Sequence, residues 1–366
     1  MVTLKLNFCR GNTVEEYCLP FIGFSTYGLL KWFKDKQKEH NWKWAFFYGI
    51  TFGACLFTRA TNIAPITGYI LIICIFLLVN RSYLNLLKNA LAFISGTALV
   101  LIPFIIYFAA HGALYDLIYA TFIHNIKYFN GAEPWLITYG TGILGQFFET
   151  YFAYYCILFL IIIKIYQKDY WLAAAFGVIA IVETYVFMGG FIVTHYPLVC
   201  IFQIGILMLE VVQLIKDNTK ASKSLGIVIL LFLCVHIGYN CIYKDILEIS
   251  DYRENYSEIT ERPYERLVKE IPTDELDDFV VFGRDGIAEA YLVTDTLPCN
   301  RFGFIQDWYA SFSEKIEADI RKEYAENGPT WILSDQGTII IDDILEKDYY
   351  VYDLEDVYVL WKKYEK

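Results

Sequence analysis

Hydrophobic residues in the first part of the chain form long runs, and short polar connections separate these runs. A helix needs about 20 mostly apolar residues to cross the hydrocarbon core of a bilayer, which is about 30 Å thick. Eight runs approach that length, so the pattern predicts eight membrane-spanning helices. The predicted spans cover residues 17–33, 43–60, 63–80, 89–109, 139–164, 170–188, 192–214 and 225–243.

After residue 244 the pattern changes to short strand-like and helix-like segments that alternate. This alternation predicts a small α/β domain, an open sheet with helices on both faces. Ser311 and Glu314 have the spacing of a capping box, and Asn327-Gly328-Pro329 is typical of a helix end. We expect strands at 279–282, 301–305, 330–333, 349–352 and 357–361, and helices at 252–271, 287–294 and 313–327.

Composition and charge support this division of the chain. Hydrophobic residues make up 56% of the sequence and aromatic residues 18%, which is too apolar for an ordinary soluble protein. Residues 1–244 carry 17 Lys+Arg against 11 Asp+Glu, whereas residues 245–366 carry 13 against 30. We therefore predict a polytopic α-helical membrane domain, 1–244, followed by an acidic soluble α/β domain, 245–366.

Basic residues are distributed unevenly among the polar connections. They are dense in 31–43, 81–88, 164–168 and 216–223, while the other connections hold Arg59, Lys127 or none. Because Lys-rich and Arg-rich loops stay in the cytoplasm, these four connections are predicted to be cytoplasmic. The Arg59 turn, the 110–138 loop and the domain after residue 244 are then outside a multi-pass protein of the cell membrane.

The outer loop 110–138 has apolar residues at helical spacing, with Asp116, His124 and Lys127 between them. This pattern predicts a helix that lies in the membrane interface and ends near Gly131. Asp116 and Lys127 have a simpler interpretation as the solvated face of such a helix.

Two adjacent carboxylates, Glu15 and Glu16, precede the first predicted span. Charge beside hydrocarbon is costly unless it is paired or hydrated, so an acidic pair in this position indicates a functional site. The alternative is a helix N-terminus, where Thr13, Glu15 and Glu16 complement the helix dipole.

Further ionisable residues are predicted at the same outer depth as the acidic pair. They are Arg59, in the segment that continues to Asn62, together with Lys127, Glu183 and His195. A carboxylate that acts as general base and an arginine that binds phosphate suit a reaction between a lipid-linked phosphate and a hydroxyl group. Both groups also have a structural interpretation. Arg59 would only extend its charge from a tight turn to the membrane surface, and Glu183 would form a buried hydrogen bond with His195.

Five short motifs carry a resemblance to a known family. They are Gly11-Asn12-Thr13-Val14-Glu15-Glu16-Tyr17, Arg59-x-x-Asn62, Gly112-Ala113-Leu114-Tyr115-Asp116, Leu297-Pro298-Cys299-Asn300-Arg301 and Gln306-Asp307-Trp308. With these motifs the chain resembles the bacterial GT-C glycosyltransferases, and it is similar to the protein O-mannosyltransferases and the lipid A aminoarabinose transferase of the family-39 type. The resemblance implies sugar transfer from a polyprenyl-phosphate donor to a protein, lipid or glycan on the outer face of the membrane.

Residue roles follow from the same resemblance. Glu15 or Glu16 matches the second acidic motif of the family and is the expected catalytic residue. Arg59 matches a basic position suited to the donor phosphate, and we expect Asn62, Lys127 and His195 to contribute to substrate binding. The principal catalytic acid of the family follows an initial span that this sequence lacks, so we expect the chain to be truncated at its N-terminus.

We expect no cofactor, and no nucleotide or nucleic-acid partner. Five of the nine cysteines lie inside apolar runs and none has CxxC spacing, so neither a structural disulfide nor a zinc site is expected. Several carboxylates could hold a divalent metal, although no ligand spacing requires one. The alternative functions are a transporter or flippase of a lipid-linked sugar, with Glu210 and His236 as intramembrane candidates, and a non-catalytic membrane fragment.

Overall fold

The computed structural model describes residues 13–131, 152–188, 196–238, 246, 249, 262–283, 285–335 and 340–364. The chain divides into two compact units, Met1–Ile249 and Ser250–Lys366. The division falls five residues after the boundary predicted from the sequence.

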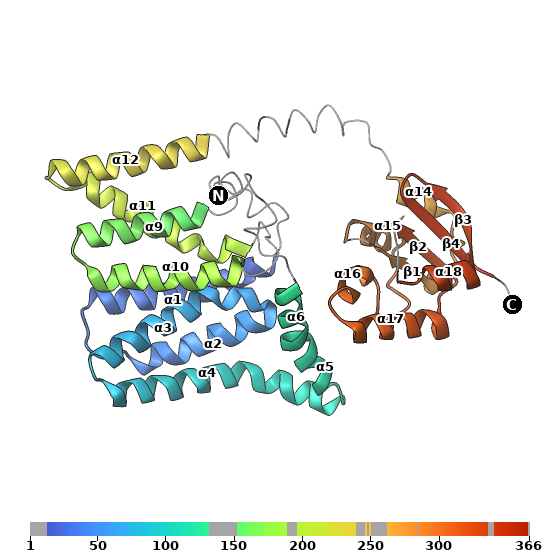
Figure 1. Cartoon of the computed structure of the whole chain (residues 1–366), viewed down its shortest axis with the longest axis horizontal. Coiled ribbons are helices and arrows are strands. Elements are labelled where there is room, and N and C mark those ends of the chain that lie inside the picture. Colours follow the sequence, from blue (N-terminus) through green and yellow to red (C-terminus); the bar gives the residue numbers. More distant parts are fainter. Residues whose placement is uncertain are drawn as a thin grey trace. The chain divides into compact units, whose positions relative to one another are not determined.

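The N-terminal unit is a bundle of helices that lie side by side along a common direction (Figure 1). Consecutive helices run in opposite directions, and the connections α1–α2, α3–α4, α9–α10 and α11–α12 lie at the same end. These are the Lys-rich and Arg-rich connections, so the fold gathers them on one side of the bundle. The helices are α1 (Val14–Lys34), α2 (Trp42–Thr58), α3 (Ala64–Val79), α4 (Tyr83–Ala110), α9 (Phe152–Tyr166), α10 (Tyr170–Met188), α11 (Ile201–Lys216) and α12 (Lys220–Ile237).

Five of the described helices are long and apolar enough to cross a membrane. They start at Ala60, Tyr83, Tyr170, Leu198 and Lys220, in line with five of the predicted spans. The protein is therefore membrane-associated and mostly helical. Helices α1 and α2 form where the first two spans were predicted, but α1 carries charges at both ends and α2 has 17 residues. Most of the predicted span 139–164 lies outside the described residues, and the total of eight remains a prediction.

Helices α2 and α4 approach each other most closely in the bundle. A Cβ atom added to Gly49 would lie 2.1 Å from the carbonyl oxygen of Phe93, and one added to Gly96 would lie 2.0 Å from that of Phe46. The Thr97 hydroxyl also donates to the carbonyl oxygen of Gly49 at 3.1 Å. Small residues that let two backbones touch are typical of helix pairs in membranes.

A further helical segment lies across the end of the bundle, on the side opposite the Lys-rich connections (Figure 1). It consists of α5 (Leu114–Ile118), a π-helical turn η3 (Tyr119–Ile123) and α6 (His124–Gly131). Helical structure is thus observed over 114–131, the described part of the predicted helix in the 110–138 loop, and residues 132–138 lie outside the described residues. Its crosswise direction is the one that an interfacial helix adopts.

The C-terminal unit contains a four-stranded sheet of order β1-β2-β4-β3. Strands β1 and β2 are parallel, and β4 pairs with β2 and β3 in antiparallel fashion. Four of the five predicted strands are confirmed. The strands are β1 (Phe279–Phe282), β2 (Trp331–Asp335), β3 (Tyr349–Glu355) and β4 (Tyr358–Lys363). The helical segments are α14 (Pro263–Lys269), η7 (Leu276–Asp278), η8 (Asp285–Glu289), α15 (Ala290–Thr294), α16 (Gln306–Ala310), α17 (Glu314–Asn327) and α18 (Asp342–Asp348).

Both faces of the sheet are buried at strands β1 and β2, as the alternation of side chains along β1 shows. Phe279 and Val281 pack in one cluster with α14 and α15, while Val280 and Phe282 pack in another with α16, α17 and α18. Residues of a strand alternate between its faces, so a strand buried on both sides reads as a continuous apolar run. The prediction of an open sheet covered on both faces is confirmed.

Two predictions in this unit are wrong. The segment 301–305 is not a strand, because Ile305 has a left-handed backbone with φ of 48° and is the N-cap of α16. Helix α17 is capped by Ser313, whose hydroxyl accepts from the backbone N–H of Ile316 at 3.3 Å. The Ser311 hydroxyl instead donates to the carbonyl oxygen of Trp308.

Candidate functional site

The two adjacent glutamates at the start of α1 have different environments. The Glu16 carboxylate accepts from the backbone N–H of Thr13 at 3.2 Å, as the third helical residue of a capping box does. Glu16 therefore stabilises the helix N-terminus, which was the alternative interpretation of the acidic pair. Glu15 points into the bundle and is fully buried.

Glu15 forms an ion pair with Arg59, which follows the last residue of α2. One guanidinium nitrogen, Nη1, lies 2.7 Å from Oε1 of Glu15. The Glu15 side chain is 0% exposed, whereas that of Arg59 is 34% exposed. The pair therefore consists of a buried carboxylate and a guanidinium group that is partly exposed.

Local structure explains how Arg59 comes to this position. Residue 59 is extended, with φ of −165°, and the 3₁₀ turn η2 (Ala60–Ile63) begins directly after it. The backbone N–H of Asn62 donates to the Arg59 carbonyl oxygen at 3.0 Å, which closes the connection between α2 and α3. This tight turn faces the start of α1.

Asn62 is buried beside the ion pair and belongs to a polar cluster with Cys18 and Thr58. Its amide nitrogen lies 3.4 Å from the Cys18 sulfur and 3.4 Å from the Thr58 hydroxyl oxygen. The Thr58 hydroxyl and the Cys18 sulfur are 3.1 Å apart. The structure therefore brings three of the predicted site residues together: Glu15, Arg59 and Asn62.

Among the described residues, Oε2 of Glu15, Oδ1 of Asn62 and Oγ1 of the adjacent Thr61 are buried and have no hydrogen-bond partner. Buried polar atoms are nearly always hydrogen-bonded, so an unpaired group needs an explanation such as a missing ligand or water. All three atoms are hydrogen-bond acceptors, and a hydroxyl group is a donor that would satisfy one of them.

Among the described residues, Lys127 does not take part in the ion pair of Glu15 and Arg59. The Lys127 side chain is exposed, and its ammonium group lies 5.7 Å from the centre of the Tyr119 ring. His195, and with it the predicted pair with Glu183, lies outside the described residues.

Burial also affects His124 in the crosswise helix. The pKa of His124 is lowered, first by burial of the ring and second by the nearby Lys127 ammonium. His124 is therefore held in its neutral form at neutral pH.

A second buried carboxylate, Glu183 in α10, is hydrogen-bonded to Gln203 in α11. The Gln203 amide nitrogen lies 2.6 and 2.7 Å from the two carboxylate oxygens. Glu183 is 1% exposed, inside a helix that is long and apolar enough to span a membrane. The sequence analysis missed Gln203, although its polar side chain interrupts an apolar run and so marks a buried partner.

The two intramembrane residues proposed for a transporter have structural partners. Glu210 pairs with Lys164 at 2.6 Å and accepts a hydrogen bond from the Gln167 amide at 3.0 Å. Lys164 and Gln167 lie at the end of α9, so this network is near the Lys-rich side of the bundle. The His236 ring is stacked on Phe152, with 4.0 Å between ring centres.

Within the described part of the chain, no group of three or more His, Cys, Asp or Glu is arranged to hold a metal ion. The fold and the cluster define a class: a membrane-associated helical protein with a separate α/β unit and an ion pair between a buried glutamate and a partly exposed arginine. Comparison with known proteins gives no match, either to a family model or to a curated protein.

Proposed function

We propose that the protein is a membrane glycosyltransferase that moves a sugar from a polyprenyl-phosphate donor to a hydroxyl group of a protein, lipid or glycan. The observation that carries the proposal is the ion pair between the buried Glu15 carboxylate and the partly exposed Arg59, close to the buried Asn62. Buried charges are rare in membrane helices, and those that occur mark substrate sites or ion pathways.

Arg59 is assigned to the donor phosphate. Its side chain is 34% exposed, and it is oriented by the Glu15 carboxylate at 2.7 Å. Arginine remains charged near lipid and offers a planar set of donors that matches phosphate oxygens. Since positive charge beside the departing phosphate stabilises the transition state, Arg59 would act on the leaving group.

Glu15 is assigned to the acceptor hydroxyl. Its Oε1 holds Arg59, and its Oε2 has no hydrogen-bond partner among the described residues. In the proposed inverting step the acceptor oxygen attacks the anomeric carbon, the bond from that carbon to the phosphate oxygen breaks, and Glu15 takes the hydroxyl proton. The polyprenyl phosphate leaves with the electron pair of the broken bond.

The proposed membrane arrangement has about eight spans, with the Lys-rich connections in the cytoplasm and the α/β unit outside. Its support is that four basic connections share one end of the bundle, whereas Glu15 and Arg59 lie at helix ends on the opposite side (Figure 1). The reaction would then occur on the outer face, where the crosswise segment 114–131 also lies. The proposed donor and acceptor meet there at the membrane surface.

The transporter alternative has less support than the enzyme. Glu210 was its midplane candidate, but its partners Lys164 and Gln167 are near the helix ends. A charged pair with a hydrogen-bonded amide is sufficiently explained by packing of α9 against α11.

The experiment is transfer of a labelled polyprenyl-phosphate sugar by the purified protein. Arg59→Ala is expected to lower the rate about 100-fold or more, as loss of a transition-state charge contact does. Glu15→Gln is expected to lower it about 100-fold by removing the general base. The matched control is Glu16→Gln, one residue away, which removes the charge but keeps a side-chain oxygen for the capping box and should keep the rate within a few fold. Ordinary transfer by Glu15→Gln and Arg59→Ala, or no transfer by the wild-type chain, contradicts the proposal.

A further inference from the structure

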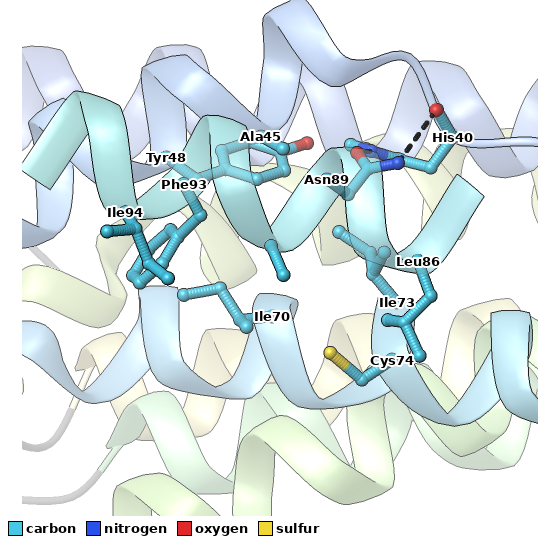
Figure 2. A pocket seen from close by; sticks show the side chains of 11 residues that line it. His40, Ala45, Tyr48, Ile70, Ile73, Cys74, Leu86, Asn89, Phe93 and Ile94 are labelled. Atoms are coloured by element: carbon cyan, nitrogen blue, oxygen red, sulfur yellow. Dashed lines mark hydrogen bonds between the residues drawn. The ribbon is translucent and has the colours of Figure 1, made fainter. Parts of the chain in front are cut away.

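A cavity of about 170 Å³ lies between α2, α3 and α4, towards the Lys-rich end of the bundle (Figure 2). Its walls are formed mainly by apolar side chains, including Ile70, Ile73, Leu86 and Phe93. No charged residue lines it. An apolar cavity of about 150 Å³ in a protein core stays free of water and binds a molecule of the size of benzene. This cavity therefore suits a hydrocarbon group.

His40, which precedes α2, lies at one side of the cavity, with its polar atoms behind the apolar wall. The imidazole Nδ1 lies 2.6 Å from Oδ1 of Asn89. The Asn89 amide nitrogen donates to the carbonyl oxygens of His40 at 3.1 Å and Asn85 at 2.8 Å, which fixes Oδ1 as the acceptor. Nδ1 of His40 must then carry the proton, so Nε2 of the neutral ring is an acceptor.

Two complementary polar atoms at this side have no hydrogen-bond partner in the part of the chain that the structure describes. Nε2 of His40 is a buried acceptor, and the Tyr48 hydroxyl is a buried donor. The two ring centres are 5.6 Å apart, and Figure 2 shows the Tyr48 hydroxyl directed towards the His40–Asn89 pair. A single oxygen that both donates and accepts would satisfy the two atoms together.

The cavity also has access to the surface that faces hydrocarbon. Ile94, in its wall, is 60% exposed. Leu87 and Leu91 on the same helix, α4, are exposed as well. Since α4 is among the helices that are long and apolar enough to span a membrane, this exposed face is the one that lipid covers.

We propose that this cavity binds a neutral, hydroxyl-bearing membrane lipid of the long-chain alcohol type. The hydroxyl proton is donated to Nε2 of His40, the hydroxyl oxygen accepts from Tyr48, and the hydrocarbon chain fills the apolar part and leaves past Ile94. Both polar atoms lie just behind the wall, so the two rings adjust as the hydroxyl enters. The site is at the opposite end of the bundle from Glu15 and Arg59 and does not depend on the proposed transfer reaction.

A charged lipid head is a poor fit, because burial of a charge without a partner is costly and the lining has no charged residue. A water molecule alone would satisfy His40 and Tyr48 but leave the apolar walls without contacts.

The test is photolabelling of the full chain in lipid nanodiscs with a diazirine-bearing long-chain alcohol. The matching alkane, with the same diazirine and no hydroxyl group, is the second probe. The alcohol is expected to label peptides of α3 and α4 about tenfold more than the alkane, as expected for the added hydrogen bonds. Equal labelling by both probes contradicts the proposal. So does the absence of labelling of these helices, which leaves water as the occupant.

Two variants separate the polar from the apolar contribution. Tyr48→Phe should reduce labelling by the alcohol to near the level of the alkane while the thermal unfolding temperature does not fall, because the hydroxyl has no partner in the protein. Cys74→Phe fills the cavity and should abolish labelling by both probes. Its control is Cys234→Phe on α12, which is exposed and outside the cavity. Unchanged preference for the alcohol in Tyr48→Phe also contradicts the proposal.

Discussion

At the scale of single residues, the neighbours Glu15 and Glu16 illustrate how position on a helix determines role. Glu15 shares the buried side of α1 with Cys18, Ile22 and Leu29, at intervals of three, seven and fourteen residues. Glu16 is one position off this stripe and caps the helix. The periodicity of 3.6 residues per turn therefore explains why Glu15 and not Glu16 faces the bundle interior, a choice that the sequence had left open. Its partner, 44 residues away, follows only from the tertiary fold.

Burial of His40 makes stability depend on pH. Desolvation lowers the pKa of His40 from 6.5 to about 4, while the hydrogen bond to Asn89 opposes this shift. The unfolded chain takes up a proton below pH 6.5 that the folded chain does not, so stability is complete above pH 6.5 and falls as the pH decreases towards 4. The expected loss is about 3 kcal/mol at most.

Thermal unfolding of the detergent-solubilised protein between pH 4 and pH 8 measures this effect. His40→Gln should remove most of the decline, whereas His111→Gln, which is exposed, should leave it in place. An identical decline in His40→Gln shows that other groups cause it.

The Gln203 amide is expected to stabilise the buried Glu183 carboxylate. Gln203→Leu keeps a similar volume but removes both hydrogen bonds, and a buried carboxylate without them should destabilise the protein by about 2 kcal/mol. The double variant Glu183→Leu/Gln203→Leu removes both polar partners and should recover most of the loss. The free energy of unfolding in detergent distinguishes these outcomes, and a single variant as stable as wild type would show that the pair contributes nothing.

At the scale of elements, long apolar runs were the most informative part of the sequence. Five of them match helices that are long and apolar enough to span a membrane, and their ends agree within a few residues. Short elements were less predictable. The segment 301–305 has residues that suit a strand, but the Gln306 side chain donates to the Phe302 carbonyl oxygen at 2.7 Å and Ile305 turns into α16. Such side-chain contacts are not visible in a local pattern.

The approach of α2 to α4 predicts strong sensitivity at Gly49. A Cβ atom there would lie 2.1 Å from the Phe93 carbonyl oxygen and 2.8 Å from the Thr97 nitrogen, both backbone atoms. Gly49→Ala must push the helices apart, at an expected cost of about 2 kcal/mol. Gly177→Ala in α10 is the matched control, because no atom lies within 4 Å of its added Cβ and alanine favours helix. Equal unfolding temperatures for the two variants contradict the close packing.

At the scale of the whole molecule, charge asymmetry makes the strongest prediction about sidedness. A phosphatase reporter, which is active only outside the cytoplasm, is expected to be active when fused at the C-terminal end and inactive when fused at Asn218, in the α11–α12 connection. Activity of both fusions, or of the Asn218 fusion alone, overturns the proposed orientation. It would also remove the outer-face site from the proposed transfer reaction.

Only some residues of the candidate site could be predicted from the sequence. Arg59 was identified from its predicted outer depth and Asn62 from the motif Arg59-x-x-Asn62, and the fold places Arg59 against Glu15 and Asn62 against Cys18. Lys127 was assigned to the same site because of its predicted depth, but depth does not determine lateral position. The cavity at His40 and Tyr48 was not predicted, since it arises from packing of three helices.

Strand β3 forms one edge of the sheet, and its residues Tyr350, Val351, Tyr352 and Leu354 are exposed. An edge strand with apolar side chains on both faces is a template for pairing with another chain. If the C-terminal unit were released by proteolysis or expressed alone at high concentration, copies would tend to associate through β3 into insoluble aggregates. A charged substitution such as Val351→Lys, in the middle of that strand, would then be the simplest way to keep such a fragment in solution.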